Sequence, residues 1–231
     1  MQVTDIVEAY YKPLLDQAEG DQLDWLKKDM AQSMGIVIAY TSIFPQDEFE
    51  EVFPEYEAIK PLNGGMFKGI IDGKVRKDGE IVLLEHKTTS EKNIYKYIDQ
   101  LALDDQATGY IWLTDAKAVF YNIIKKTAFR QATWESIDKY CVRIIKDYKE
   151  NPEKYVYRTV VYKSKRDIEQ WIEETKQVIK DMETCTAFYP TKRCALYGAC
   201  EYIPLCRMGE DEFTKKELYV RERTRGNRSI N

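Results

Sequence analysis

The stretch from Gly65 to Thr88 constrains the fold of this chain most, because it is typical of a β-hairpin closed at Asp78-Gly79. Asp-Gly is a residue pair that favours a two-residue type I′ turn, in which both central residues need a positive φ. Counting outward from such a turn predicts four cross-strand pairs: Lys77 with Glu80, Val75 with Val82, Gly73 with Leu84, and Asp72 with Glu85.

The predicted register puts two carboxylates and one lysine on the same face of the hairpin. Asp72 and Glu85 lie directly opposite each other with Cβ atoms about 5 Å apart. Lys87 lies two residues beyond Glu85 and so points to the same face. Facing carboxylates repel when both are ionised, and a hard divalent cation such as Mg²⁺ or Mn²⁺ relieves that repulsion. The pattern predicts a metal-dependent phosphodiesterase site.

Other groups of the hairpin complete this prediction. The backbone carbonyl of His86 is a further candidate oxygen ligand, whereas its imidazole points to the opposite face of the sheet. Lys87 is expected to orient a water molecule or to offset charge in the transition state. The alternative is an ordinary exposed Glu-Lys pair. The run Ile81–Leu84 favours a site, because it is apolar on both faces, as in a central strand of a covered sheet.

The rest of the chain predicts an α/β fold with helices flanking a mixed central sheet. Helical periodicity spans residues 4–40, where Pro13 is expected to interrupt or to re-start the first of two helices. A strand is predicted from Glu48 to Leu62 and another from Ala118 to Lys125, the second parallel to the hairpin's latter strand. The remaining predicted helices cover residues 93–113, 135–149 and 167–182, with an extended stretch at 155–162.

Charge and hydropathy limit the function classes. The net charge is −4, but residues 214–231 carry about +4, and a basic tail suits phosphate contact or simple solvation. No apolar run reaches the length of a membrane helix, and the N-terminus lacks the layout of a signal peptide. We therefore expect a cytoplasmic protein with no membrane partner.

Four of the five cysteines lie close together near the C-terminus: Cys185, Cys194, Cys200 and Cys206. In a reducing compartment such a cluster favours metal binding over disulfides, either as a zinc site or as an iron-sulfur cluster. The spacings lack the C-x2-C pairs typical of zinc ribbons, which weakens the zinc interpretation. Buried free cysteines are the remaining alternative.

Three motifs follow one another along the chain: the G-x-x-D motif ending at Asp72, the E-x-K motif from Glu85 to Lys87, and the Q-x-x-x-Y motif from Gln106 to Tyr110. In this order they make the chain resemble the PD-(D/E)XK nuclease superfamily. The match is closest to the RecB-like branch, which includes phage recombination exonucleases and CRISPR-associated exonucleases. The resemblance covers about residues 20–206. It implies a restriction-endonuclease-like core in which Asp72 and Glu85 bind Mg²⁺ and Lys87 is catalytic. Gln106 and Tyr110 then position the DNA strand or the water.

The chain also departs from the family pattern. Ile71 replaces the proline that names the superfamily, and the histidine ligand that many RecB-like members carry on a core helix is missing. Glu57 or Glu19 is a candidate substitute for that ligand. The C-terminal cysteines resemble those of iron-sulfur RecB-like nucleases, which implies a structural 4Fe-4S cluster. Its first ligand is Cys185, or Cys141 as the alternative.

Together with the predicted hairpin site, the resemblance implies a Mg²⁺-dependent DNA exonuclease in DNA processing or recombination. The expected organisation is a nuclease domain over residues 1–183, a cysteine-stapled lobe over 184–210 that packs on it, and a basic tail over 211–231. By resemblance alone, a single-strand annealing or other recombination protein is a candidate partner. The rival hypotheses are a non-catalytic DNA-binding module on a degenerate nuclease fold, and a zinc-stapled interaction domain.

Overall fold

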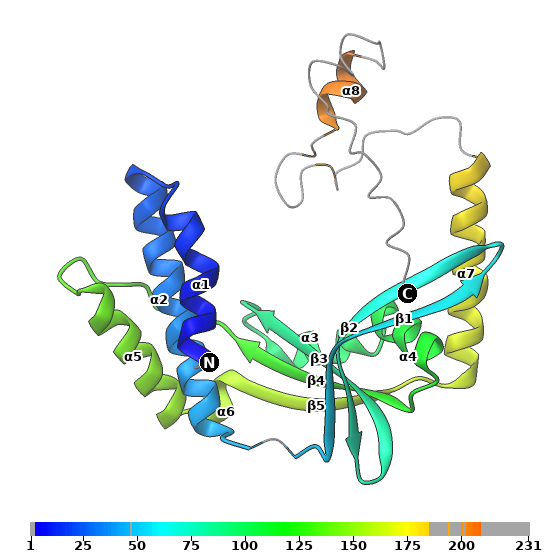
Figure 1. Ribbon diagram of the computed structural model, residues 1–231, viewed down its shortest axis with the longest axis horizontal. Helices are drawn as coiled ribbons and strands as arrows, with labels where there is room; N and C mark the ends of the chain where they lie inside the picture. The colour runs from blue at the N-terminus through cyan, green and yellow to red at the C-terminus, as the bar shows by residue number, and fades with distance from the viewer. Residues whose placement is uncertain (1–2, 47, 185–193, 195–199, 201, 209–231) are drawn as a thin grey trace, which may run out of the picture. The chain divides into compact units, whose positions relative to one another are not determined.

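A five-stranded mixed sheet with strand order β1-β2-β3-β4-β5 is the centre of the fold in the computed structural model (Figure 1). Neighbouring strands are antiparallel except β3 and β4, which are parallel. The strands are β1 (Glu51–Leu62), β2 (Gly65–Lys77), β3 (Glu80–Thr89), β4 (Ala118–Lys125) and β5 (Val156–Tyr162). This mixed sheet with flanking helices confirms the predicted fold class.

Eight helices are assigned in the part of the chain that the structure describes, which is residues 3–46, 48–184, 194, 200 and 202–208. They are α1 (Val3–Leu15), α2 (Gly20–Ile43), α3 (Ile94–Leu101), α4 (Asp105–Thr114), α5 (Ile137–Glu150), α6 (Pro152–Tyr155), α7 (Lys165–Thr184) and α8 (Ile203–Met208). None of these helices is long and apolar enough to cross a membrane. The chain divides into two compact units, residues 1–177 and 178–231, and α7 crosses the boundary.

The hairpin between β2 and β3 has the predicted turn and most of the predicted register. Asp78 and Gly79 have φ values of 52° and 76°, as a type I′ turn requires. Three of the predicted pairs are present: Lys77 with Glu80, Val75 with Val82, and Gly73 with Leu84. The ladder stops there, so the predicted backbone pairing of Asp72 with Glu85 is wrong.

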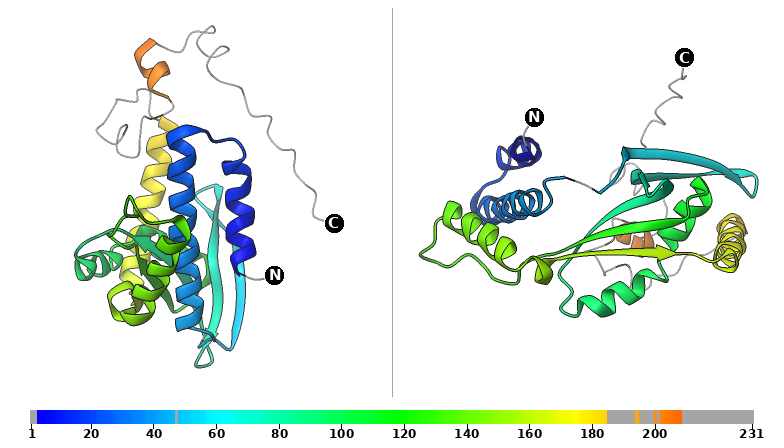
Figure 2. Two further views of the ribbon diagram at one scale, coloured as in Figure 1. Left: turned by 90° about the vertical axis from the view of Figure 1, so that its left-hand side faces the viewer. Right: turned by 90° about the horizontal axis from the view of Figure 1, so that it is seen from below.

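Helices cover the sheet through separate apolar clusters. One face packs on α3, α4 and the start of α7 through a core that includes Ile71, Leu83 and Tyr121. At the other end of the first unit, α2 packs on α5, and α1 packs on α2 (Figures 1 and 2). The α4 helix itself contacts β1, β2 and β4, and its Gln106 and Tyr110 side chains meet the hairpin there.

Two helix predictions need correction. The helix predicted over residues 93–113 is broken into α3 and α4, because the Asp104 side chain accepts a hydrogen bond from the Gln106 N–H and caps a new helix. Pro13 does not interrupt α1, which runs on to Leu15. The proline removes a single backbone hydrogen bond, the one to the carbonyl four residues earlier, and only Leu14 and Leu15 of α1 follow it.

Candidate active site

Asp72 lies where β2 parts from β3, at a position that the β1–β2 ladder skips before it continues at Ile71. The register positions opposite it are Glu55 on β1 and Glu85 on β3, and neither is paired with it in the described ladders. Glu55 adopts a left-handed backbone with φ 49°, which non-glycine residues rarely do. The Asp72 carboxylate instead accepts the backbone N–H of His86 at 2.8 Å. That bond replaces the strand contact and ties the carboxylate to the Glu85–Lys87 segment.

Glu85 has a buried carboxylate, and one of its two oxygens has no hydrogen-bond partner among the described residues. Its side chain is only 7% exposed, and Oε1 accepts a hydrogen bond from the Lys87 ammonium at 2.7 Å. Its other oxygen, Oε2, is buried and has no hydrogen-bond partner among the described residues. Burial of an unpaired carboxylate oxygen is costly, so Oε2 fits a site that a cation completes.

Lys87 joins the carboxylate to the helix beside it. Its ammonium donates to Gln106 Oε1 at 2.6 Å as well as to Glu85. Gln106 Nε2 donates to the Tyr110 hydroxyl at 3.0 Å, and that hydroxyl donates to the Ile70 carbonyl at 2.7 Å. Gln106 and Tyr110 are four residues apart on α4, so both side chains lie on one helix face. The structure thus brings Glu85, Lys87, Gln106 and Tyr110 into one hydrogen-bonded chain.

The electrostatics of the pair follow from its partial burial. Burial raises the pKa of Glu85, the hydrogen bond from Lys87 opposes that rise, and the charges of Asp72 and Asp104 add to it. For Lys87, burial alone lowers the pKa, but the hydrogen bond and charge of Glu85 and the charge of Asp104 outweigh it, so the pKa is raised. The ammonium therefore stays charged at neutral pH.

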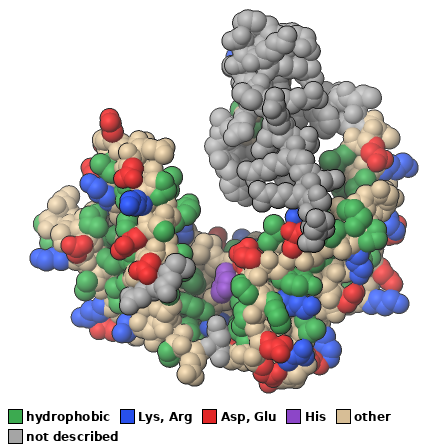
Figure 3. Space-filling model, in the orientation of Figure 1, with side chains coloured by type: hydrophobic (Ala, Val, Ile, Leu, Met, Phe, Trp, Pro, Cys, Tyr) green, Lys and Arg blue, Asp and Glu red, His purple; other side chains and the backbone are tan. Residues whose placement is uncertain are grey.

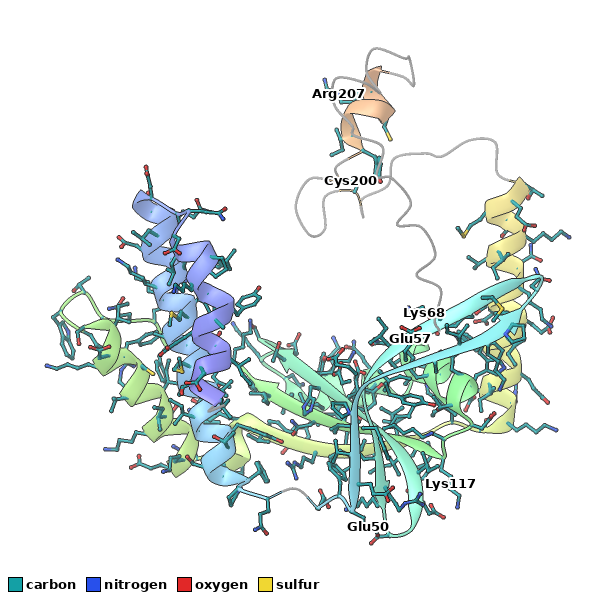
Figure 4. All side chains as sticks on the ribbon, viewed as in Figure 1. Glu50, Glu57, Lys68, Lys117, Cys200 and Arg207 are labelled. Atoms are coloured by element: carbon teal, nitrogen blue, oxygen red, sulfur yellow. The ribbon has the colours of Figure 1, made fainter. Side chains whose placement is uncertain are left out.

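The two predicted substitutes for the missing histidine ligand, Glu57 and Glu19, do not join the Glu85 site among the described contacts. Glu57 forms an ion pair with Lys68 at 2.7 Å, with both side chains about half exposed, on the β1–β2 hairpin (Figure 4). Glu19 precedes α2 and is exposed. Among the described residues, no three or more histidine, cysteine, aspartate or glutamate side chains are grouped so as to hold a metal. Asp72, Glu85 and the main-chain oxygen of His86 remain the predicted ligands at the hairpin.

His86 faces away from Glu85, as predicted. Its ring is exposed (Figure 3, purple), and its Nδ1 lies 2.8 Å from Asn122 Nδ2. Asn122 is 1% exposed on β4, where it is the register partner of His86. The His86 residue is thus held on both sides, since its backbone N–H bonds Asp72 and its ring contacts Asn122.

Sequence reasoning missed two residues that support the site. Asp104 caps α4 and accepts a hydrogen bond from the Tyr121 hydroxyl at 2.8 Å, and its charge acts on both Glu85 and Lys87. The Asp104-Asp105 pair ahead of Gln106 is the helix-start signal that would have identified it. Asn122 had a signal too, since a single amide inside the apolar strand AVFYNIIK indicates a buried polar group that needs a partner.

The structure describes four of the five predicted cysteine ligands: Cys141, Cys194, Cys200 and Cys206. Cys185 lies outside the described residues. The backbone N–H of Cys200 donates to the Cys194 carbonyl at 2.9 Å, and Cys206 lies on α8. Cys141 lies on α5 and packs against the α2–α5 core, where burial raises the pKa of its thiol. A raised pKa disfavours the thiolate that a metal needs.

Comparison with known proteins decides the family. The sequence model of the PD-(D/E)XK nuclease superfamily matches residues 2–207. The chain belongs to this superfamily. Its motif residues Asp72, Glu85 and Lys87 meet where β2 and β3 part, beside α4. No curated protein sequence matches the chain.

Solved structures similar to this superfamily member include three exonucleases. A phage-related exonuclease from Haemophilus somnus 129PT has 12% identity and a TM-score of 0.39, with 78% of this chain and 83% of that chain covered. A putative exonuclease from Eubacterium rectale has 12% identity and a TM-score of 0.38, with 85% and 80% covered. An alkaline exonuclease from Laribacter hongkongensis has 10% identity and a TM-score of 0.33, with 80% and 93% covered. Similarities this low do not bear on function.

Proposed function

We propose that this protein is a divalent-metal-dependent deoxyribonuclease of the RecB-like branch that acts as an exonuclease. The observation that carries the proposal is the buried Glu85 carboxylate, with Oε1 bonded to Lys87 and Oε2 left without a partner. A chain that only needed to fold gains nothing from such an oxygen, since burying it unpaired costs free energy. Membership of a nuclease superfamily supplies the reaction class.

The donor set suits a hard cation. Asp72, Glu85 and the His86 carbonyl offer oxygen ligands, which Mg²⁺ and Mn²⁺ prefer. Bound Mg²⁺ supplies Lewis-acid chemistry that polarises the phosphoryl group and favours ionisation of water. The reaction is hydrolysis: water adds to phosphorus, the P–O bond to the leaving oxygen breaks, and a phosphomonoester and a hydroxyl result.

The chain's own residues supply charge and position. Hydrogen bonds to Glu85 and Gln106 hold the Lys87 ammonium in one position before substrate binds. From that position its positive charge offsets the negative charge that builds on the phosphoryl oxygens. Gln106 holds that ammonium from α4, and Tyr110 accepts a hydrogen bond from Gln106 and anchors the helix to β2 through the Ile70 carbonyl. Their proposed role is to position the DNA strand.

One observation favours the rival, a non-catalytic DNA-binding module. The described residues hold no cluster of three or more acidic, histidine or cysteine side chains suited to a metal. Under that rival, the motif residues support binding without turnover.

A cleavage assay separates the two. Linear DNA with a labelled end is incubated with Mg²⁺ and the wild-type protein, Lys87→Ala, or Lys146→Ala, a control in which an exposed lysine of α5 is removed. We expect labelled mononucleotide from the wild type and the control, and a rate lowered about 100-fold or more in Lys87→Ala. Melting curves check that Lys87→Ala is folded. Metal-dependent binding with intact DNA favours the rival.

The finer features of the proposal come from the resemblance. They are a structural 4Fe-4S cluster held by Cys185, or by Cys141 in its place, with Cys194, Cys200 and Cys206, a cytoplasmic setting, and a recombination protein as partner. We also propose the organisation predicted from the sequence, a nuclease domain over residues 1–183, a cysteine lobe over 184–210 and a tail over 211–231.

A further inference from the structure

A cavity lies at the far end of the first unit from α4 and takes no part in the hairpin site. Its volume is about 540 Å³, and we call it the Trp25 cavity. Residues of α2, the segment after β4 and one residue of α5 line it: Trp25, Lys28, Asp29, Gln32, Thr127, Ala128, Phe129, Arg130, Gln131 and Tyr140.

Its lining combines an open aromatic surface with positive charge. Trp25 is 60% exposed although it belongs to a helix that packs on two neighbours. Lys28 and Arg130 are exposed, and neither forms an ion pair with another residue in the described part of the chain. The single acid of the lining, Asp29, accepts a hydrogen bond from the Tyr11 hydroxyl. A net positive lining stands out in a chain whose net charge is −4.

The segment after β4 is tied to α5 by an ion pair between the half-exposed Arg143 and the buried Glu135 carboxylate. Arg143 forms two hydrogen bonds of 2.7 Å to the Glu135 carboxylate and a third, of 3.0 Å, to the Arg130 carbonyl. Its guanidinium also lies 4.3 Å from the centre of the Phe129 ring. Glu135 neutralises Arg143, so Arg143 fixes the backbone while the Arg130 side chain keeps an uncompensated charge. The cavity wall is therefore formed in advance of any ligand.

The cavity lies at the carboxyl end of the parallel strand pair. Its segment begins directly after β4, and the Lys126 N–H donates to the Thr89 carbonyl at the end of β3 at 2.7 Å. Glu85 lies four residues before Thr89, which is about 13 Å along the strand. Ligands of open α/β sheets bind outside the carboxyl ends of strands, so both features border the same edge of the sheet.

We propose that the Trp25 cavity binds single-stranded nucleic acid, with a base stacked on Trp25 and phosphates contacted by Lys28 and Arg130. Aromatic stacking together with backbone neutralisation is the chemistry of sequence-tolerant single-strand binding. The proposal rests on the proposed nuclease function in one respect, because the bound segment is a continuation of the strand at the hairpin site. Binding itself requires no turnover.

The test measures binding without cleavage. A fluorescein-labelled oligothymidine is titrated with protein in EDTA, and anisotropy is recorded over a range of salt concentrations. The variants are Trp25→Ala and the double variant Lys28→Ala with Arg130→Ala. The controls are Tyr162→Ala and Arg166→Ala, which remove an exposed aromatic and an exposed cation outside the cavity lining.

Stacking and phosphate contact have different signatures. We expect Trp25→Ala to weaken binding by about fivefold to 100-fold with an unchanged salt dependence. The double variant is expected to weaken binding and to reduce the slope of log K against log salt by about 1.4, since each phosphate contact contributes about 0.7 for single strands. The controls keep wild-type affinity and slope.

Two results overturn the proposal: unchanged affinity in both variants, or a fluorescent polyglutamate that binds as tightly with the same dependence on Trp25. The second result identifies an acidic peptide as the occupant. A parallel cleavage assay of the wild type keeps this test separate from the proposed function. If the wild type cleaves DNA and the cavity variants bind normally, only the proposal of binding in the Trp25 cavity is contradicted. If the wild type is inactive and the cavity variants lose binding, only the proposed nuclease function is contradicted.

Discussion

Glu85 Oε2 is the atom on which the account of this site depends. Its carboxylate is buried, bonded through one oxygen to Lys87, and close enough to the charges of Asp72 and Asp104 for both to raise its pKa. A cation bound beside it has the opposite effect, because a nearby positive charge favours the ionised form. Proton and metal therefore compete for the same carboxylate.

This competition predicts a metal-dependent acid limit of the reaction. Because the pKa of Glu85 is raised, its carboxylate protonates at a higher pH than an ordinary glutamate as pH falls, and activity falls with it. Raising the Mg²⁺ concentration should move the acid limb of the kcat/KM profile to lower pH. The measurement is the pH profile at low and at saturating Mg²⁺. An acid limb at the same pH in both conditions contradicts the assignment of Glu85 as a ligand.

Residue types in the motifs were predictable, whereas their supports were not. The hairpin count identified Glu85 and Lys87, and the family resemblance identified Gln106 and Tyr110. The structure joins these four residues by hydrogen bonds. Asp104 was passed over because the helix through it looked continuous. The predicted backbone pairing of Asp72 with Glu85 is absent from the ladder. The Asp72 carboxylate still reaches the Glu85–Lys87 segment, by accepting the His86 N–H.

At the scale of elements, a glycine sets how closely α4 approaches β2. A Cβ added at Gly69 would lie 2.8 Å from Tyr110 Cε1 and 2.7 Å from Leu113 Cδ1. Real side chains do not tolerate such distances, so Gly69 allows the close approach that lets the Tyr110 hydroxyl reach the Ile70 carbonyl.

Gly69→Ala should therefore damage the site more than the fold. We expect a stability loss of about 1–3 kcal/mol from overpacking and a fall in cleavage rate of about tenfold as the Tyr110 ring is displaced. Gly109→Ala is the matched control, because its Cβ would meet the Trp171 ring of α7 at 2.8 Å. Rates and melting temperatures are measured for both. Equal rate losses at equal melting temperatures contradict a specific role for the Gly69 contact.

The contact between α1 and α2 has its own pH signature. Tyr11 is buried and donates to Asp29, and burial together with that bond raises its pKa to about 12. A raised folded-state pKa stabilises the fold below pH 10, and the stabilisation is lost as pH rises toward 12.

Tyr11→Phe should remove this dependence at a cost of about 1 kcal/mol at neutral pH. Urea unfolding at pH 8 and pH 11 measures both effects. The wild type is expected to lose more stability than the variant between these pH values. Parallel losses in the two proteins contradict the role of the Tyr11–Asp29 bond.

On the scale of the whole molecule, periodicity and connection rules predicted the architecture well. The parallel pairing of β3 with β4 followed from a helical segment between two strands, and the pairing is present. The break between α3 and α4 was not predictable from periodicity, because the apolar residues keep helical spacing across it, from Ile94 to Ile111. The C-terminal prediction depends on Cys185 and residues 211–231, which lie outside the described part.

The cysteine proposal has a direct optical test on the full chain. Four thiolates around an iron-sulfur cluster give a coloured protein, whereas zinc gives a colourless one. We expect visible absorption in anaerobically purified wild type, its loss in Cys200→Ser, and its retention in Cys141→Ser. Colourless protein with bound zinc contradicts the cluster, and loss of colour in Cys141→Ser makes Cys141 a ligand in place of Cys185.

The central claim is that Glu85 and its neighbours form a metal-dependent phosphodiesterase site. The measurement that tests it most directly is mononucleotide release from end-labelled linear DNA by the wild type and by Glu85→Gln, each in Mg²⁺ and in EDTA. The account predicts release by the wild type in Mg²⁺ alone, and a rate at least about 100-fold lower for Glu85→Gln. Release that persists in EDTA, or an equal rate in Glu85→Gln, would contradict it.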